Sequence, residues 1–180
     1  GLVFDDSGYS VHVCEAEHSI PAYSYLFTEK DRPGRFYPDK AKALGIPEGK
    51  LWHELQSDKE VTVDGKLVRP SDVMGEKRQG IKIGISGDTR PTDKLAEFFK
   101  GCNYMTFDST YSDTLRDKAK DNYHSTAKEA AELAKKAGVS NLILTHFSAR
   151  YEDVAELVSE AKTIHDSVTA ARDLLEIDLK

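Results

Sequence analysis

The chain has 180 residues, 39% of them hydrophobic and 31% charged, a composition typical of a globular protein that can bury a core. No apolar run approaches the roughly 20 residues that a membrane-spanning helix needs, and no signal-peptide pattern opens the chain, so we expect a cytoplasmic protein. The net charge of −6 excludes a protein that coats nucleic acid by charge alone. Cys14 and Cys102 lack metal-binding spacing and are expected to be free thiols.

The first 30 residues predict two strands, at 9–14 and 23–28, separated by a loop. The segment 30–80 then lacks clear periodicity and is rich in Gly and Pro, and only a hairpin at 61–68, around Asp64-Gly65, can be placed in it. So long an interruption of a domain is more often functional or mobile than structural. Residues 29–82 carry 12 basic and 10 acidic side chains, so this part can contact phosphates although the whole chain is acidic.

From residue 81 onward, short apolar strands alternate with amphipathic helices, which is typical of an α/β fold. The predicted strands are 81–85, 104–107, 141–145 and 174–179, and the predicted helices are 92–99, 126–137 and 153–164. The middle helix has a capping box, with Thr126 followed by Glu129, and it ends at Gly138.

Polar side chains follow three of these strands at the point where each ends: Asp88, Asp108 and His146. Ligands collect at the carboxyl ends of strands in α/β sheets, so these side chains would converge if the strands are neighbours. Carboxylates and imidazoles are ligands of divalent metals such as zinc. Each residue also has an ordinary interpretation: the aspartates as turn or helix caps, and the histidine as a hydrogen-bonded group at the edge of the core.

His18, in the loop between the first two strands, is unremarkable by itself. His124 is a candidate functional residue, because it directly precedes the helix at 126–137. The helix dipole disfavours the cationic form of a histidine at a helix N-terminus, which suits a proton-transfer group near neutral pH. We assign structural roles to His12, His53 and His165.

Four motifs, HSIPAYSY, SGDTR, YHSTAKEAA and LTHFSARY, together resemble ribonuclease Z, the tRNA 3′-processing endonuclease family of the metallo-β-lactamase superfamily. The resemblance extends from about residue 12 to residue 179. It implies an α/β fold of the αββα sandwich type, of which residues 1–180 would form the C-terminal half. Residues 30–80 would be an inserted, protruding exosite arm that grips tRNA.

The resemblance also implies roles for the site residues. His18 and His146 would each bind one of two zinc ions, with manganese as an alternative metal, and Asp88 would bridge the two ions. His124 would stabilise or protonate the leaving group. Asp108 stands where the family has a glutamate that orients this histidine, so its shorter carboxylate would have to reach His124 directly or through a water molecule.

Precursor tRNA is the partner that the resemblance implies, and cleavage would leave a 3′ hydroxyl. The expected RNA contacts are Arg150, Ser148 and Arg90 near the cleaved bond, and Pro47, Gly49 and Lys50 in the arm. Family members commonly form homodimers, which we expect here as well.

The H-x-H-x-D-H motif that completes the metal centre of the family is absent from these 180 residues. We therefore expect the chain to be the C-terminal part of a longer protein; a split gene or a degenerate homologue would also explain the absence. Two other functions stay open: a non-catalytic RNA-binding or scaffold module, and a hydrolase of small phosphate or sulfate esters.

Overall fold

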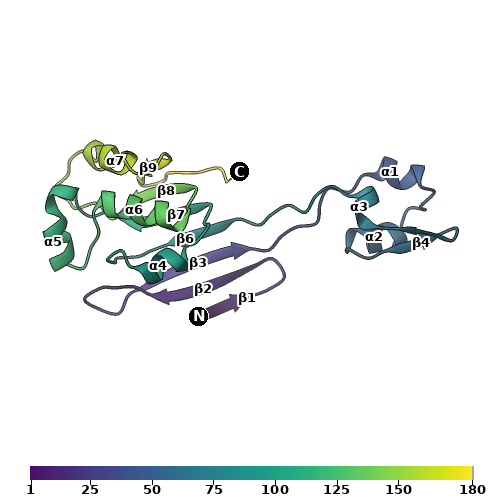
Figure 1. Cartoon of the computed structure of the whole chain (residues 1–180), viewed down its shortest axis with the longest axis horizontal. Coiled ribbons are helices and arrows are strands. Elements are labelled where there is room, and N and C mark those ends of the chain that lie inside the picture. Colours follow the sequence, from purple (N-terminus) through teal and green to yellow (C-terminus); the bar gives the residue numbers. More distant parts are fainter. Residues whose placement is uncertain (180) are drawn as a thin grey trace. The chain divides into compact units, whose positions relative to one another are not determined.

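The computed structural model describes residues 1–179, and over this range the main sheet has seven strands in the order β1-β2-β3-β6-β7-β8-β9 (Figure 1). The strands are β1 (Leu2–Asp5), β2 (Tyr9–Glu15), β3 (Tyr23–Glu29), β6 (Lys82–Ile85), β7 (Tyr104–Asp108), β8 (Asn141–Thr145) and β9 (Val168–Ala170). The pairs from β1 to β6 are antiparallel, and those from β6 to β9 are parallel. The α/β class is confirmed.

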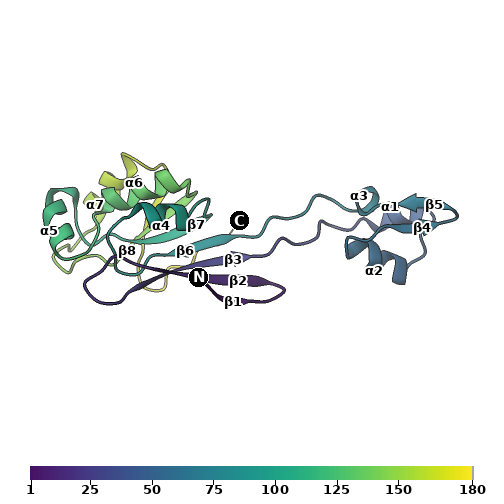
Figure 2. The same ribbon diagram turned by 60° about the horizontal axis from the view of Figure 1, so that its bottom comes forward.

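Helices cover one face of this sheet (Figure 2). They are α4 (Asp93–Phe98), α6 (Ala127–Ala137) and α7 (Ala155–Lys162), and a 3-10 turn (Asp113–Leu115) and α5 (Arg116–Asp121) lie between β7 and α6. The predicted capping box of α6 is confirmed, because Thr126 and Glu129 each bond the backbone N–H of the other. Gly138 ends the helix with a left-handed φ of 67°.

The core lies between the helices and every second residue of the parallel strands. Met105 and Phe107 of β7 and Leu142 and Leu144 of β8 are buried against α4, α6 and α7. The strands must approach the helices closely here. A Cβ atom on Gly84 of β6 would lie 2.5 Å from the ring of Phe99, so glycine alone fits at this position.

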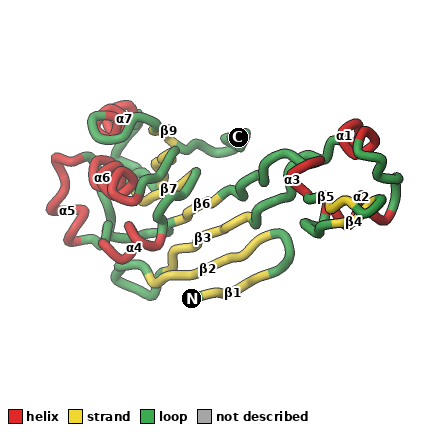
Figure 3. Tube along the Cα trace, turned by 45° about the vertical axis from the view of Figure 1, so that its right-hand side comes forward, coloured by secondary structure: helices red, strands yellow, loops and turns green. Residues whose placement is uncertain are grey.

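The alternate residues of the strands lie on the other face of the sheet. Within the main unit, residues 1–29 and 81–179, no described helix covers that face (Figure 3). One row across this face joins Val13, Tyr25, Ile85, Thr106 and Ile143. Tyr25 and Ile85 in this row are 43% and 47% exposed, so this part of the face is both apolar and accessible.

Residues 30–80 form a second compact unit with a core of its own. It contains α1 (Pro38–Ala43), α2 (Lys50–Gln56), β4 (Val61–Val63), β5 (Lys66–Val68) and α3 (Pro70–Val73). Six residues form its buried centre: Ala41, Ile46, Leu55, Val61, Val68 and Val73. The predicted hairpin is confirmed, with left-handed φ angles at Asp64 and Gly65. The three short helices of this segment were not predicted.

The second unit is inserted between two neighbouring strands, β3 and β6. The backbone N–H of Glu29, at the end of β3, donates to the carbonyl of Ile81 at 2.9 Å, just before β6 begins. The points at which the chain leaves and re-enters the main unit therefore lie side by side. Within the insertion the two connecting segments stay paired, because Arg32 and Arg78 exchange both of their backbone hydrogen bonds.

The C-terminal region differs from its prediction. Residues 174–179 form no strand, and the last strand is β9, at Val168–Ala170. Leu174 has a left-handed φ of 62° and is 99% exposed, which is incompatible with an extended buried strand beginning there. None of the described helices has the length and apolarity that a bilayer crossing requires.

We predict that Gly84→Ala lowers the free energy of unfolding by about 1–3 kcal/mol, the usual cost of forcing an extra methyl group into a packed core. The added Cβ would collide with Phe99. Urea denaturation would measure the loss, and Gly8→Ala, where the nearest atom is 3.5 Å away, is the matched control. Equal stability of the two variants would contradict the close packing of Phe99 on β6.

Candidate metal centre and histidine cluster

The ends of β6, β7 and β8 bring three predicted residues together, because these strands are parallel neighbours. Oδ2 of Asp88 lies 3.4 Å from Nε2 of His146, and Oδ1 of Asp108 lies 3.9 Å from Nδ1 of the same histidine. The predicted convergence of the three strand ends is confirmed. Asp88 and His146 are both partly exposed, whereas Asp108 is fully buried.

Two loops add His18 and His124 to this group. The ring centroids of His18 and His124 are 5.1 Å apart, and those of His124 and His146 are 4.9 Å apart with nearly parallel planes. Donor atoms of His18, Asp88 and His124 all lie within 4.8 Å of one another, and so do those of Asp108, His124 and His146. The five side chains thus form two overlapping clusters, each of a size that can surround a cation.

Asp108 is held by more hydrogen bonds than any other side chain of the cluster. Its Oδ2 accepts from the backbone N–H of Thr89 at 3.0 Å and from Nδ1 of His124 at 2.8 Å. Its Oδ1 accepts from the N–H and the hydroxyl of Thr110, at 3.1 and 2.7 Å, and from the N–H of Ser125 at 3.4 Å. These five donors satisfy a carboxylate that burial would otherwise destabilise, and they leave it little capacity to bind a metal.

The shorter carboxylate of Asp108 therefore reaches His124 directly, without a water molecule. A carboxylate only accepts, so Nδ1 of His124 carries the hydrogen and Nε2 is the other reactive atom. His18 has the same arrangement, because its Nδ1 lies 3.0 Å from the carbonyl of Tyr123, which also only accepts. Neutral His18 and His124 consequently both have their lone pair on Nε2, the atom that can bind a metal or a proton.

Two residues at the site, Tyr123 and His146, have a left-handed backbone conformation. Both Tyr123 and His146 have φ of 60°, a conformation that side-chain-bearing residues rarely adopt. Tyr123 is the residue whose carbonyl accepts the hydrogen bond from Nδ1 of His18. Such conformations cost about 1 kcal/mol or more each and gather at functional sites, where the surrounding contacts enforce them.

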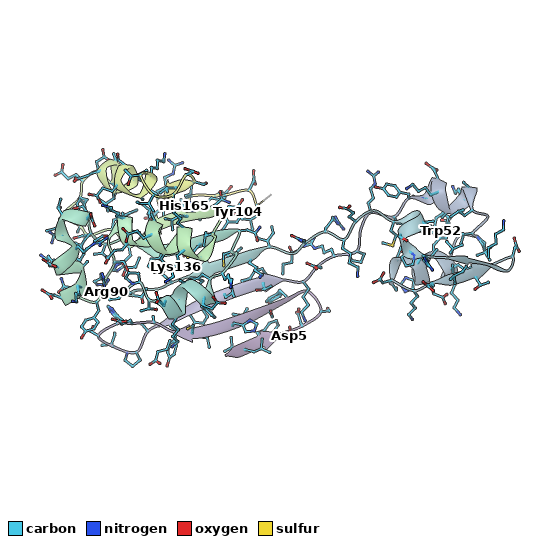
Figure 4. The ribbon with its side chains drawn as sticks, in the orientation of Figure 1. Asp5, Trp52, Arg90, Tyr104, Lys136 and His165 are labelled. Atoms are coloured by element: carbon cyan, nitrogen blue, oxygen red, sulfur yellow. The ribbon has the colours of Figure 1, made fainter. Side chains whose placement is uncertain are left out.

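Arg90, which is labelled in Figure 4 and is predicted to contact RNA, forms hydrogen bonds within the protein. Its guanidinium forms a bidentate ion pair with Glu129 and also donates to the carbonyl of His124. The side chains of Arg90 and Glu129 are only 13% and 8% exposed. Arg90 thus links the start of α6 to the backbone of His124, and its contact with RNA stays a prediction.

The other predicted RNA contacts lie at the surface. Arg150 is exposed, with its guanidinium carbon 5.1 Å from the ring centre of Tyr111 and its Nε donating to the hydroxyl of Ser148 at 3.1 Å. Pro47, Gly49 and Lys50 belong to the second unit and precede or begin α2, where the side chain of Lys50 is 88% exposed.

Some residues of the site were not predicted. Thr110 and Ser125 donate to Asp108, and the hydroxyl of Ser125 also bonds the carbonyl of Thr89 at 2.6 Å. The only signal in the sequence is their proximity to Asp108 and His124. Neither His12, His53 nor His165 belongs to a metal-capable group within the described residues.

We predict that Glu129→Gln lowers the free energy of unfolding by about 3–5 kcal/mol, because it leaves the buried guanidinium of Arg90 without its counter-charge. Glu54→Gln, which breaks an exposed pair with Lys50, is the control and should cost less than about 0.5 kcal/mol. Thermal and urea denaturation would measure both. A small effect at Glu129 would show that the pair is not effectively buried.

No protein-family model matches the chain, but curated proteins do. It is 58% identical over 178 residues to a protein of Nitrosopumilus maritimus named ribonuclease Z, and 42% identical over 180 residues to one of Methanosarcina acetivorans with the same name. Each alignment covers 99% of this chain, but 60% and 59% of the two relatives. The chain thus spans about three-fifths of the length of these relatives.

Solved structures have the same fold. The short form of human tRNase Z gives a TM-score of 0.61 at 24% identity. The match covers 99% of this chain and 46% of the human chain. The metallo-β-lactamase fold protein YhfI of Bacillus subtilis gives a TM-score of 0.60 at 15% identity, covering 94% of this chain and 49% of its own. These likenesses establish the metallo-β-lactamase fold, and the curated relatives establish the family. The chain therefore belongs to the ribonuclease Z family.

Proposed function

We propose that this chain forms part of a zinc-dependent endoribonuclease that removes the 3′ trailer from precursor tRNA and leaves a 3′ hydroxyl. The observation that carries the proposal is the convergence of His18, Asp88 and His146 beside a histidine that Asp108 orients. The relatives named ribonuclease Z support the same activity. A cytoplasmic homodimer is the form that the resemblance suggests.

The donor set fits two divalent ions, with zinc preferred to manganese because imidazole suits zinc. His18 and His146 would each bind one ion, and Asp88, which lies in one cluster with His18 and 3.4 Å from His146, would bind both. When bound, such ions offset the negative charge of the phosphodiester and lower the pKa of a water molecule.

His124 would act as the proton donor to the departing oxygen. Its Nδ1 is engaged by Asp108, so Nε2 is the atom left to transfer a proton. The buried carboxylate accepts the hydrogen bond from Nδ1 and so fixes the orientation of the ring. The ring of His124 lies close to those of His18 and His146, so the proton would be delivered at the site where the phosphodiester is held.

Three ligands are too few for two zinc ions, so the other ligands would come from outside these 180 residues. The relatives are longer than this chain, which supports that origin. The uncovered face of the sheet, with its exposed Tyr25 and Ile85, offers an apolar surface on which a second sheet layer would pack. The complete enzyme would then be an αββα sandwich.

The inserted unit at 30–80 would bind tRNA away from the chemistry. It has its own core, and the stretch 29–82 carries an excess of basic residues, as shape- and phosphate-directed RNA recognition requires. Pro47, Gly49 and Lys50 would contribute there, and exposed Arg150 with Ser148 would contact RNA near the cleaved bond. The presence of His18, Asp88 and His146 in one cluster argues against a non-catalytic scaffold. The insertion argues against a hydrolase of small esters.

The role of His146 as a ligand predicts that His146→Ala in the full protein lowers the rate of precursor-tRNA cleavage by more than ~100-fold, beyond the loss typical of outer-shell partners. The zinc content should fall, whereas the affinity for tRNA should stay within about 3-fold, or less than 1 kcal/mol. His53→Ala, which changes a histidine outside the cluster, is the control. Unchanged cleavage by His146→Ala would refute the metal-binding role.

The role of the insertion can be tested by replacing residues 30–80 with an Asn-Gly turn, since Glu29 and Ile81 are already hydrogen-bonded neighbours. We expect kcat/KM for precursor tRNA to fall about 100-fold, equivalent to ~3 kcal/mol of lost binding. Hydrolysis of bis(p-nitrophenyl) phosphate, a small phosphodiester, should be retained. Equal losses for both substrates would mean that the insertion supports the fold rather than tRNA binding.

A further inference from the structure

The hydroxyl of Thr110 lies between two members of the site that do not bond each other directly. Its Oγ1 is 2.7 Å from Oδ1 of Asp108 and 2.8 Å from Nδ1 of His146. Thr110 is buried, with 5% of its surface exposed. A buried hydroxyl placed at hydrogen-bond distance from both a carboxylate and an imidazole fixes the direction of both bonds.

The direction follows from the number of hydrogens available. Three backbone N–H groups, those of Thr89, Thr110 and Ser125, donate to the carboxylate of Asp108, which therefore acts as an acceptor throughout. The single hydrogen of the Thr110 hydroxyl must then be donated to Asp108. Its oxygen is left to accept, and the remaining hydrogen bond has to come from Nδ1–H of His146.

From this geometry we propose that Thr110 is a positioning residue that fixes the tautomer and ring orientation of His146, so that its Nε2 is free to bind metal. The inference rests on the proposed function, which makes that Nε2 a ligand. It also means that one carboxylate controls two histidines: Asp108 holds His124 through Oδ2 and His146 through Oδ1 and Thr110. Both histidines lie near Asp88: it shares a cluster with His124, and its Oδ2 is 3.4 Å from Nε2 of His146.

The backbone around His146 is held independently of this hydroxyl. The N–H of Ser109 donates to the carbonyl of Thr145 at 2.9 Å, and the N–H of Ser148 donates to the carbonyl of Thr110 at 3.1 Å. These bonds tie the two loops together on either side of His146. A substitution that removes only the hydroxyl should therefore free the imidazole ring while the loop stays in place.

The test compares Thr110→Val, which keeps the shape but removes the hydroxyl, with Thr110→Ser, which keeps the hydroxyl. Thr62→Val, the same change at an exposed position of β4 in the second unit, is the matched control. Zinc affinity of the full protein would be measured by competition with a chromogenic chelator. We expect Thr110→Val to raise the Kd for zinc about 10- to 100-fold, the effect typical of losing an outer-shell partner. Thr110→Ser and Thr62→Val should bind zinc like the unmodified protein.

Assays of precursor-tRNA cleavage distinguish the role of Thr110 from the proposed function. At saturating zinc, Thr110→Val should recover most of its kcat, because His124 keeps its own bond to Asp108. Unchanged zinc affinity in Thr110→Val would overturn the role of Thr110 and leave the proposed function standing. An unmodified protein that binds zinc but does not cleave precursor tRNA would overturn the proposed function alone.

A second measurement needs no variant and decides the question even if Thr110→Val does not fold. Long-range ¹H–¹⁵N correlation spectra of the zinc-free, unmodified protein report which ring nitrogen of each neutral histidine carries the hydrogen. We expect His146 to carry it on Nδ1, as Thr110 requires. A hydrogen on Nε2 of His146 would overturn the proposal.

Discussion

The carboxylate of Asp108 is fully buried and accepts hydrogen bonds from five groups, which come from three separate segments of the chain. Thr89 belongs to the loop after β6, Thr110 to the loop after β7, and His124 and Ser125 to the approach to α6. Leaving any of these donors unpaired in the interior would cost about 1–3 kcal/mol. The three segments are therefore held together because each of them donates hydrogen bonds to the same buried carboxylate.

A further set of polar contacts, between Glu129, Arg90 and the backbone of His124, supports this arrangement. Glu129 closes the capping box of α6 and also binds the guanidinium of Arg90, which in turn donates to the carbonyl of His124. The start of α6, the loop after β6 and the backbone of His124 thus share one buried ion pair. Because the charges of this pair compensate each other, the pair positions the cluster without adding net charge to it.

Much of this could be predicted from residue patterns with a strong local cause. The apolar runs at 104–107 and 141–145, the capping box at Thr126 and the turn at Asp64-Gly65 all appear as expected. The roles of Arg90 and Thr110 could not be predicted, because their partners are distant in sequence or depend on which face a loop presents. The helices of the second unit are four to seven residues long, too short for periodicity to show.

The insertion leaves the main unit at Glu29 and returns at Ile81, two residues that are already hydrogen-bonded. Antiparallel strands need only a short turn to join them, so the sheet and the cluster do not require the 51 residues between. Substitutions in the insertion are consequently not constrained by the geometry of the histidines. The two units can therefore diverge at different rates, because residues of the insertion can change while the hydrogen bonds that hold the histidines are preserved.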